Sequence, residues 1–378
     1  MIIKNGAVFK AEGEFSISSI KIEGDKIIEI SKDAFDEKDE EVIDVMDMYV
    51  IPGLIDIHLH GCNGHDFCEG NKEALKKISE YELMNGITSI CLASMTLDEA
   101  NLSKIFENVA TYHNNGGADI VGINMEGPFL SIKKAGAQNM KYLQKPDVDM
   151  FNRLQQASKG LIKLVDMAPE IEGGLDFIEE VSPFVRVSLA HTEADYSLSK
   201  EAFNKGASQV THLYNAMRPF HHREPGLIGA AIDEKDVFVE LITDGIHVAD
   251  TTVRASFKLF GDDRIILISD SMEACGMPDG DYQLGGQKVI VNGTKASLED
   301  GTIAGSVTNL MDCLKIAVKN MNIPFESAIK CATANPAKSI GIYNQCGSLD
   351  IGKRADVVIL DKDFSIKYIV KDGRIIKQ

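Results

Sequence analysis

Eight short apolar runs, separated by longer amphipathic segments, constrain the fold of this 378-residue chain more than any other feature. The runs are rich in β-branched residues, which is typical of strands buried in a parallel sheet. They cover residues 50–57, 87–92, 120–125, 162–167, 185–189, 209–212, 237–242 and 265–268. Segments between them, for example at 72–84, 98–112 and 148–158, repeat apolar residues every three or four positions and are predicted as helices. This α/β alternation indicates a (β/α)8 TIM-like barrel.

Both ends of the chain show a different pattern, in which short strands are separated by turn residues. Strands are predicted at 1–9, 16–23, 26–30, 355–360, 366–370 and 374–376. We expect the two ends to form one small β-sandwich domain, residues 1–52 plus 342–378, beside a barrel domain of residues 53–341. Two further helices, at 306–320 and 324–332, are expected after the eighth barrel strand.

The composition excludes several classes of protein. The chain has 57 acidic against 39 basic residues and a net charge of −18, which argues against a nucleic-acid partner. It has no run of 18 apolar residues and no signal-peptide pattern at its start, so we expect no membrane partner and a cytoplasmic location. The seven cysteines form no CxxC pair, which is typical of reduced thiols and excludes a zinc finger.

The polar residues that follow the apolar runs belong to a narrow set of chemical types. A barrel enzyme carries its chemistry at the carboxyl ends of its strands. At those positions the sequence has His58, His60, Glu126, His191, His212 and Asp270. Any one of these residues is more often structural, but imidazoles and carboxylates gathered on one rim are the ligand set of Zn²⁺, Fe²⁺ or Mn²⁺. Their joint placement predicts a metal centre.

Several motifs resemble those of a known family. The segment VIPGLIDIHLHG at 50–61 is similar to the opening of the metal-dependent amidohydrolase superfamily, and GKRAD at 352–356 resembles its returning β-domain. More narrowly, the chain resembles the N-acetylglucosamine-6-phosphate deacetylases in seven motifs: EGPF at 126–129, APE at 168–170, HT at 191–192, THLYNAM at 211–217, REPG at 223–226, DGIH at 244–247 and AGS at 304–306. The resemblance covers essentially the whole chain.

The resemblance implies roles for the strand-end residues. Glu126, His191 and His212 would hold a divalent ion that activates water, with Zn²⁺ as the first expectation and Fe²⁺, Mn²⁺ or Co²⁺ as alternatives. His58 and His60 would hold a second ion with Glu126 as the bridging ligand, so one or two ions per subunit are expected. Asp270 would be the catalytic base toward water and then the acid toward the departing amine.

The resemblance also implies a phosphorylated amino-sugar substrate. Arg223 and His247 would bind its phosphate, together with backbone N–H groups of Asn215 and Ala216. In several relatives the arginine comes from the second subunit of a homodimer. The alternative interpretation is that the basic segment at 218–223 is a solvated surface loop. Further contacts are expected from Ala137, Gln138, Ile303, Ala304 and Gly305.

Two further features of the sequence, Gln138 and the segment 276–281, concern the expected pocket. Gln138 stands where the family usually has a histidine that positions the sugar and the acetyl carbonyl; glutamine donates a hydrogen bond but carries no charge. The turn-rich segment 276–281 is interpreted as a lid or rim loop, with an ordinary connection as the alternative.

The expected function is metal-dependent hydrolysis of N-acetyl-D-glucosamine 6-phosphate to D-glucosamine 6-phosphate and acetate, in amino-sugar catabolism or recycling. Deacetylation of N-acetylgalactosamine 6-phosphate is the alternative, because sequence alone does not identify the residues that contact the C4 hydroxyl. Another amidohydrolase activity, such as that of a dihydroorotase, is more distant. A non-catalytic amidohydrolase-like scaffold would be expected to lack the ligands that this chain retains.

Overall fold

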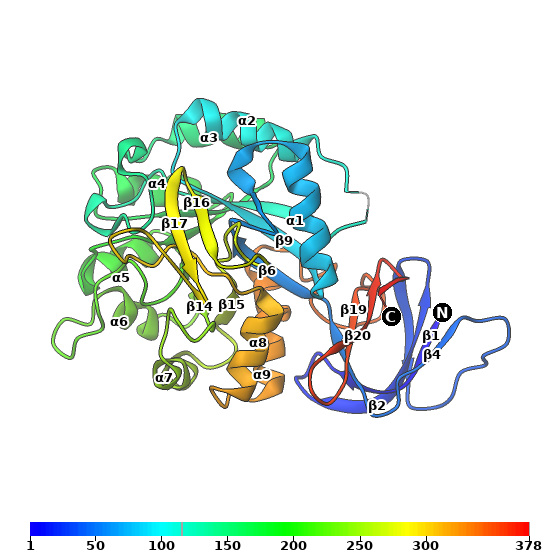
Figure 1. Cartoon of the computed structure of the whole chain (residues 1–378). Coiled ribbons are helices and arrows are strands. Elements are labelled where there is room, and N and C mark those ends of the chain that lie inside the picture. The colour runs from blue at the N-terminus through cyan, green and yellow to red at the C-terminus, as the bar shows by residue number, and fades with distance from the viewer. Residues whose placement is uncertain (115, 378) are drawn as a thin grey trace.

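The computed structural model describes residues 1–114 and 116–377, in which eight parallel strands form a nearly closed barrel (Figure 1). In chain order around the barrel they are β6 (Leu54–Leu59), β9 (Ile87–Ser94), β10 (Asp119–Glu126), β11 (Ile162–Met167), β12 (Arg186–Leu189), β13 (Gln209–Val210), β14 (Phe238–Ile242) and β15 (Ile265–Ile268). Just past β15, the N–H of Asp270 donates to the carbonyl of His58 at 2.9 Å, which joins the last strand to the first. The predicted TIM-like barrel is confirmed.

Helices surround the barrel. They are α1 (Lys72–Met84), α2 (Glu99–Ala110), α3 (Val148–Ala157), α4 (Gly174–Val181), α5 (Tyr196–Asn204), α6 (Gly226–Asp233), α7 (Asp250–Phe260), α8 (Leu310–Lys319), α9 (Phe325–Ala332) and α10 (Ala334–Ser339). The side chains of Asn71, Asp98 and Asp147 cap α1, α2 and α3 by accepting a hydrogen bond from a backbone N–H in the first turn. Every helix in the described residues is too short or too polar to cross a bilayer.

The helix predicted at 306–320 starts later than expected. Its first residues are extended, because Ser306 forms a parallel β-bridge with Ser271. The side chain of Asn309 then accepts a hydrogen bond from the N–H of Asp312 and starts α8 at Leu310. Apolar periodicity does not report such a bridge, so the sequence placed the helix start too early.

Strands from both termini form one mostly antiparallel sheet to one side of the barrel (Figure 1). The strands are β1 (Ile2–Phe9), β2 (Phe15–Glu23), β3 (Lys26–Ser31), β4 (Val42–Asp44), β5 (Tyr49–Pro52), β19 (Val357–Leu360), β20 (Ile366–Lys371) and β21 (Arg374–Lys377). β5 pairs with β19, so segments from the two ends are hydrogen-bonded neighbours. Both ends therefore build one β unit, as predicted. The domain bounds 1–52 plus 342–378 and 53–341 stay a prediction.

The apolar run at 50–57, predicted as one strand, is divided between the two sheets. β5 ends at Pro52 and β6 begins at Leu54, so Gly53 lies at the crossing. A Cβ atom at position 53 would lie 2.2 Å from the hydroxyl oxygen of Thr88 in β9, so only glycine fits this approach. Both halves of the run are buried, and for this reason hydrophobicity alone could not locate the division.

The residues after β15 form an insert that the sequence analysis did not predict. It is a three-stranded antiparallel sheet of β16 (Gly280–Leu284), β17 (Gln287–Asn292) and β18 (Lys295–Ser297). Leu284 and Val289 of this sheet pack with Met95 and Met272. The interpretation of 276–281 as a loop is therefore wrong at its end, where residues 280 and 281 already pair in β16.

A largely buried ion-pair network joins the terminal sheet to the barrel. Arg354 contacts Asp119 at the start of β10 at 2.6 Å and also pairs with Asp356. Lys371 lies 2.8 Å from Asp119 and 3.2 Å from Asp356. Both cations also contact Asp372, so two cations serve three carboxylates. Removal of one cation would leave an uncompensated charge away from water.

We expect Arg354→Met to lower the free energy of unfolding by about 3–5 kcal/mol, because buried Asp356 loses a partner. Denaturant-induced unfolding of the two proteins measures this difference. Lys205→Met is the control, since its pair with Glu179 is exposed and is expected to contribute little to stability. Equal, small effects of the two substitutions would contradict a stabilising role for the network.

Candidate metal centre

Six strand-end side chains converge at the carboxyl-terminal mouth of the barrel. They are His58 within β6 and His60 just after it, Glu126 at the end of β10, His191 after β12, His212 after β13, and Asp270 after β15. Each of the six residues is less than a tenth exposed. The structure therefore brings together every residue that the sequence placed in the metal centre and its catalytic base.

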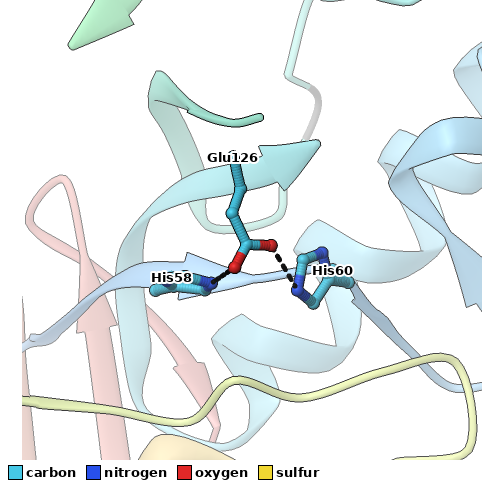
Figure 2. Close-up of side chains that lie close together, drawn as sticks. All are labelled: His58, His60 and Glu126. Carbon is cyan, nitrogen blue, oxygen red and sulfur yellow. Dashed lines mark ion pairs between the residues drawn. The ribbon is translucent and has the colours of Figure 1, made fainter. Parts of the chain in front are cut away.

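The carboxylate of Glu126 lies at the middle of this group. Its Oε1 lies 3.1 Å from Nε2 of His191 and 3.3 Å from Nε2 of His212. Figure 2 shows the other side, where Oε1 lies 3.7 Å from Nε2 of His58 and Oε2 lies 3.4 Å from Nε2 of His60. Two groups of three ligand atoms therefore share Glu126, the arrangement required of a bridging ligand.

The second ring nitrogen of three imidazoles is held by an oxygen. Nδ1 of His60 lies 3.0 Å from the carbonyl of Ala93, and Nδ1 of His191 lies 2.7 Å from that of Lys134. Since a carbonyl only accepts, these Nδ1 atoms carry the proton and each Nε2 presents a lone pair. Metal-ligating histidines are oriented by such partners.

The ring of His58 is oriented in the same way, but by a carboxylate instead of a backbone carbonyl. Its Nδ1 lies 3.1 Å from Oε2 of Glu240 in β14, while its Nε2 is buried and has no hydrogen-bond partner among the described residues. A buried nitrogen without a hydrogen-bond partner costs free energy unless a group from outside the chain interacts with it. Its direction toward Glu126 and His60 fits a divalent ion.

The turns that follow the strands aim these side chains inward. His191, His212 and Asp270 have positive φ angles of 44°, 29° and 49°. Residues other than glycine rarely adopt this conformation, and such strain concentrates at functional sites. All three lie two residues beyond the last residue of their strands, so the same sharp turn recurs around the mouth.

Asp270 lies beside the two histidines of β6. Its Oδ1 is 3.3 Å from Nε2 of His60 and 3.7 Å from Nε2 of His58. Burial disfavours the charge, but the neighbouring imidazoles, His60 first among them, outweigh it, so the pKa of Asp270 lies below its ordinary value. The carboxylate is therefore ionised near neutral pH and able to accept a proton.

A cavity of about 360 Å³ opens above the metal ligands. Seven of the nine predicted substrate-binding residues line it: Ala137, Gln138, Asn215, Ala216, His247, Ile303 and Gly305. Ala304 is fully buried and does not line the cavity. Arg223 lies on the exposed loop at 219–224, contacts His222, and does not line the cavity of its own chain.

One predicted donor is already in use. The backbone N–H of Asn215 donates to the carbonyl of His212 at 3.0 Å. The contact expected between this N–H and a phosphate stays a prediction. The tight turn that holds His212 in its inward conformation consumes this N–H.

Sequence reasoning missed several residues of the site. Glu240 orients His58, and its signal was a carboxylate within the otherwise apolar run at 237–242. Lys133 and Lys134 line the cavity, and two adjacent cations in so acidic a chain were a usable signal. Leu284 lines it from the insert, where no strand was expected.

The fold and the site together define a class of protein. A (β/α)8 barrel with a His-x-His pair, a shared glutamate, two further histidines and an aspartate at its mouth is a metal-dependent hydrolase scaffold. The family model described as the Amidohydrolase family matches residues 49–376. The chain belongs to the amidohydrolase family, whose His and Glu groups here indicate a divalent metal.

Within that family, the similar proteins have a more narrowly defined activity. An N-acetylglucosamine-6-phosphate deacetylase of Bacillus subtilis (strain 168) is 37% identical over 99% of this chain and 93% of its own length. An N-acetylgalactosamine-6-phosphate deacetylase of Escherichia coli O157:H7 is 32% identical, with 86% of each chain covered. A point variant of N-acetyl-D-glucosamine-6-phosphate deacetylase from Mycobacterium smegmatis, solved with N-acetyl-D-glucosamine-6-phosphate, superposes with a TM-score of 0.93 at 30% identity and covers 100% of this chain and 99% of its own.

The neighbour Asp244 raises the pKa of His247, which lines the cavity. Burial opposes the imidazolium, but a 2.7 Å hydrogen bond to Asp244 outweighs it, so the pKa of His247 lies above 6.5 while that of Asp244 lies below 3.8. The pair therefore stabilises the fold fully between these ordinary values. This contribution is lost as the pH rises through the raised pKa of His247, and also as it falls through the lowered pKa of Asp244.

We expect Asp244→Asn to lower the pKa of His247 below its wild-type value, because the stabilising carboxylate is removed while burial remains. NMR titration of the imidazole signals in the metal-free protein measures this pKa. The control is Asp281→Asn, which removes an exposed carboxylate paired with Lys288. An unchanged pKa in Asp244→Asn would show that Asp244 does not hold the charge on His247.

Proposed function

We propose that this protein hydrolyses the acetamide of N-acetyl-D-glucosamine 6-phosphate, giving D-glucosamine 6-phosphate and acetate in amino-sugar catabolism or recycling. The observation that carries the proposal is the Glu126-centred group of four imidazoles with Asp270 beside it, at the floor of a cavity of about 360 Å³. The names of the relatives supply the substrate class. The galactosamine epimer is the weaker alternative.

The residues of the centre fit a divalent ion. Glu126, His191 and His212 would hold one ion, and His58, His60 and Glu126 a second. Nitrogen and carboxylate donors suit Zn²⁺ first and also Fe²⁺, Mn²⁺ or Co²⁺. When bound, such an ion lowers the pKa of water and polarises the acetamide carbonyl.

Asp270 is the proposed catalytic base and acid. Its lowered pKa keeps it ionised before the reaction, so that it accepts a proton from the attacking water. It then returns this proton to the amide nitrogen as the C–N bond breaks, which lets the nitrogen leave as an amine. Its Oδ1 lies within 3.7 Å of Nε2 of both His58 and His60, at the edge of the proposed metal centre.

The phosphate is proposed to bind at the rim of the cavity. His247, whose raised pKa favours the imidazolium, lines the cavity, and Lys133 and Lys134 add positive charge. Ala137, Asn215, Ala216, Ile303 and Gly305 would contact the sugar and its acetyl group. Cations at this site attract a phosphate that the net charge of −18 would otherwise repel.

Arg223 is proposed to act in the cavity of a second copy of the chain. It is exposed, does not line the cavity of its own chain, and belongs to a basic loop that also exposes 49% of Phe220. A twofold dimer exchanges such loops between equivalent sites. The proposed active unit is therefore a homodimer.

The first experiment is acetate release by the protein stripped of metal and reloaded with Zn²⁺, Fe²⁺, Mn²⁺ or Co²⁺. We expect rapid hydrolysis of N-acetylglucosamine 6-phosphate, slower hydrolysis of the galactosamine epimer and little of N-acetylglucosamine without phosphate. Asp270→Asn is the control for contaminating activity; it should lose about 10²–10⁴-fold in kcat and keep its metal. Equal turnover of the phosphate-free sugar would overturn the substrate assignment.

A mixing experiment tests the role of Arg223. Arg223→Ala and Asp270→Asn should each be nearly inactive alone, at substrate concentrations below KM. When the two are unfolded, mixed and refolded, half of the sites in mixed dimers regain both residues, so about a quarter of wild-type activity should return. No recovery from a mixture that light scattering shows to be dimeric would place Arg223 outside the partner's cavity.

A further inference from the structure

Both ends of the Gln138 side-chain amide form hydrogen bonds within the protein. Its Nε2 donates to Oε2 of Glu126 at 2.6 Å, and its Oε1 accepts from the backbone N–H of Thr96 at 2.8 Å. The residue is only 4% exposed. A buried amide with both ends engaged is held in one orientation.

The direction of the amide follows from its partners. The reverse orientation would set the Gln138 oxygen against the Glu126 carboxylate and the Gln138 NH₂ group against the N–H of Thr96. Both contacts would be repulsive. The donor of Gln138 must therefore point at Glu126.

The loop that carries Gln138 is anchored on two sides. Gln287 of β17 donates to the carbonyl of Ala137 at 2.5 Å, which ties the loop to the insert. The carbonyl of Lys134 holds Nδ1 of His191 at 2.7 Å, which ties the loop to a metal ligand. Gln138 is thus presented to Glu126 by a braced segment rather than by a free loop.

The consequence concerns the two oxygens of Glu126. A carboxylate turns about its terminal bond unless its oxygens have different partners. The bond from Gln138 keeps Oε2 on the side of His60, which leaves Oε1 facing His191 and His212. The division of the carboxylate between the two ligand groups depends on this bond.

We infer that Gln138 is a positioning residue that orients Glu126 for metal binding, rather than a hydrogen-bond donor to the substrate. The inference rests on the proposed metal centre and is independent of the proposed substrate. It also gives a physical reason for an uncharged residue at this position. The amide donates a hydrogen bond to Glu126 at every pH. Because it carries no positive charge, it does not compete with the metal ion for the Glu126 carboxylate.

The test is the affinity of the metal-free, substrate-free protein for Zn²⁺, measured by competition with a chromophoric chelator. Gln138→Met has the same length and no donor, and it should bind Zn²⁺ about 10–100-fold more weakly, as expected when an outer partner of a ligand is lost. Gln138→His, whose ring N–H still donates, should recover most of this affinity. Thr302→Val is the matched control, since Thr302 lines the cavity and its backbone bonds to Asp300 and Leu298 rather than to a ligand; its affinity should equal that of the wild type.

The outcomes separate positioning from other roles. Wild-type Zn²⁺ affinity in Gln138→Met, together with a raised KM in acetate release, would overturn the inference and make Gln138 a substrate contact. Thermal melting of the metal-free proteins shows whether the variant folds; if the methionine variant does not, Gln138→Ala removes the same donor without new bulk and should show the same loss. Zn²⁺ binding needs no substrate, so a failure of the proposed deacetylation would leave this result interpretable.

Discussion

One buried carboxylate organises the mouth of this barrel. Glu126 is 2% exposed and surrounded by four imidazoles, and burial of such a charge is costly unless partners compensate it. Burial raises the pKa of its carboxyl, but the surrounding imidazoles outweigh burial and hold it well below its usual range. The partners come from strands far apart in the sequence, and only closure of the barrel brings them within 4 Å of one carboxylate.

The rest of the molecule keeps this arrangement rigid and gives it a pocket. Glu240 and two backbone carbonyls fix the rings of the histidines from behind, and Gln138 fixes the glutamate from the side. The insert β16–β18 contributes Leu284 to the cavity wall and braces the loop of Gln138. The terminal sheet lies away from the mouth and is tied to the barrel through Asp119, so it supports the scaffold rather than the chemistry.

The chemistry of the site was more predictable than its surroundings. His58, His60, Glu126, His191, His212 and Asp270 follow apolar runs in the sequence, and in a parallel barrel all strand ends meet at one rim. The predictions that failed depend on contacts between distant segments. The division of the run at Gly53 requires the approach of Thr88, and the late start of α8 requires the bridge of Ser306 to Ser271. The placement of Ala304 behind the cavity and of Arg223 outside it also depends on how loops fold over the rim, and the substrate contacts expected of both stay predictions.

The sequence by itself determined the barrel, the β unit from both termini, and the ligand types at the strand ends, because periodicity and strand-end position are local properties of the chain. Only the tertiary structure decided how those ligands share Glu126, which nitrogen is free in three of the imidazoles, and what Gln138 contacts. These outcomes depend on distances between side chains from different strands and on backbone conformations such as the positive φ of His212. No pattern along a single segment encodes such distances, since they arise when the strands close into a ring and the loops pack across its mouth.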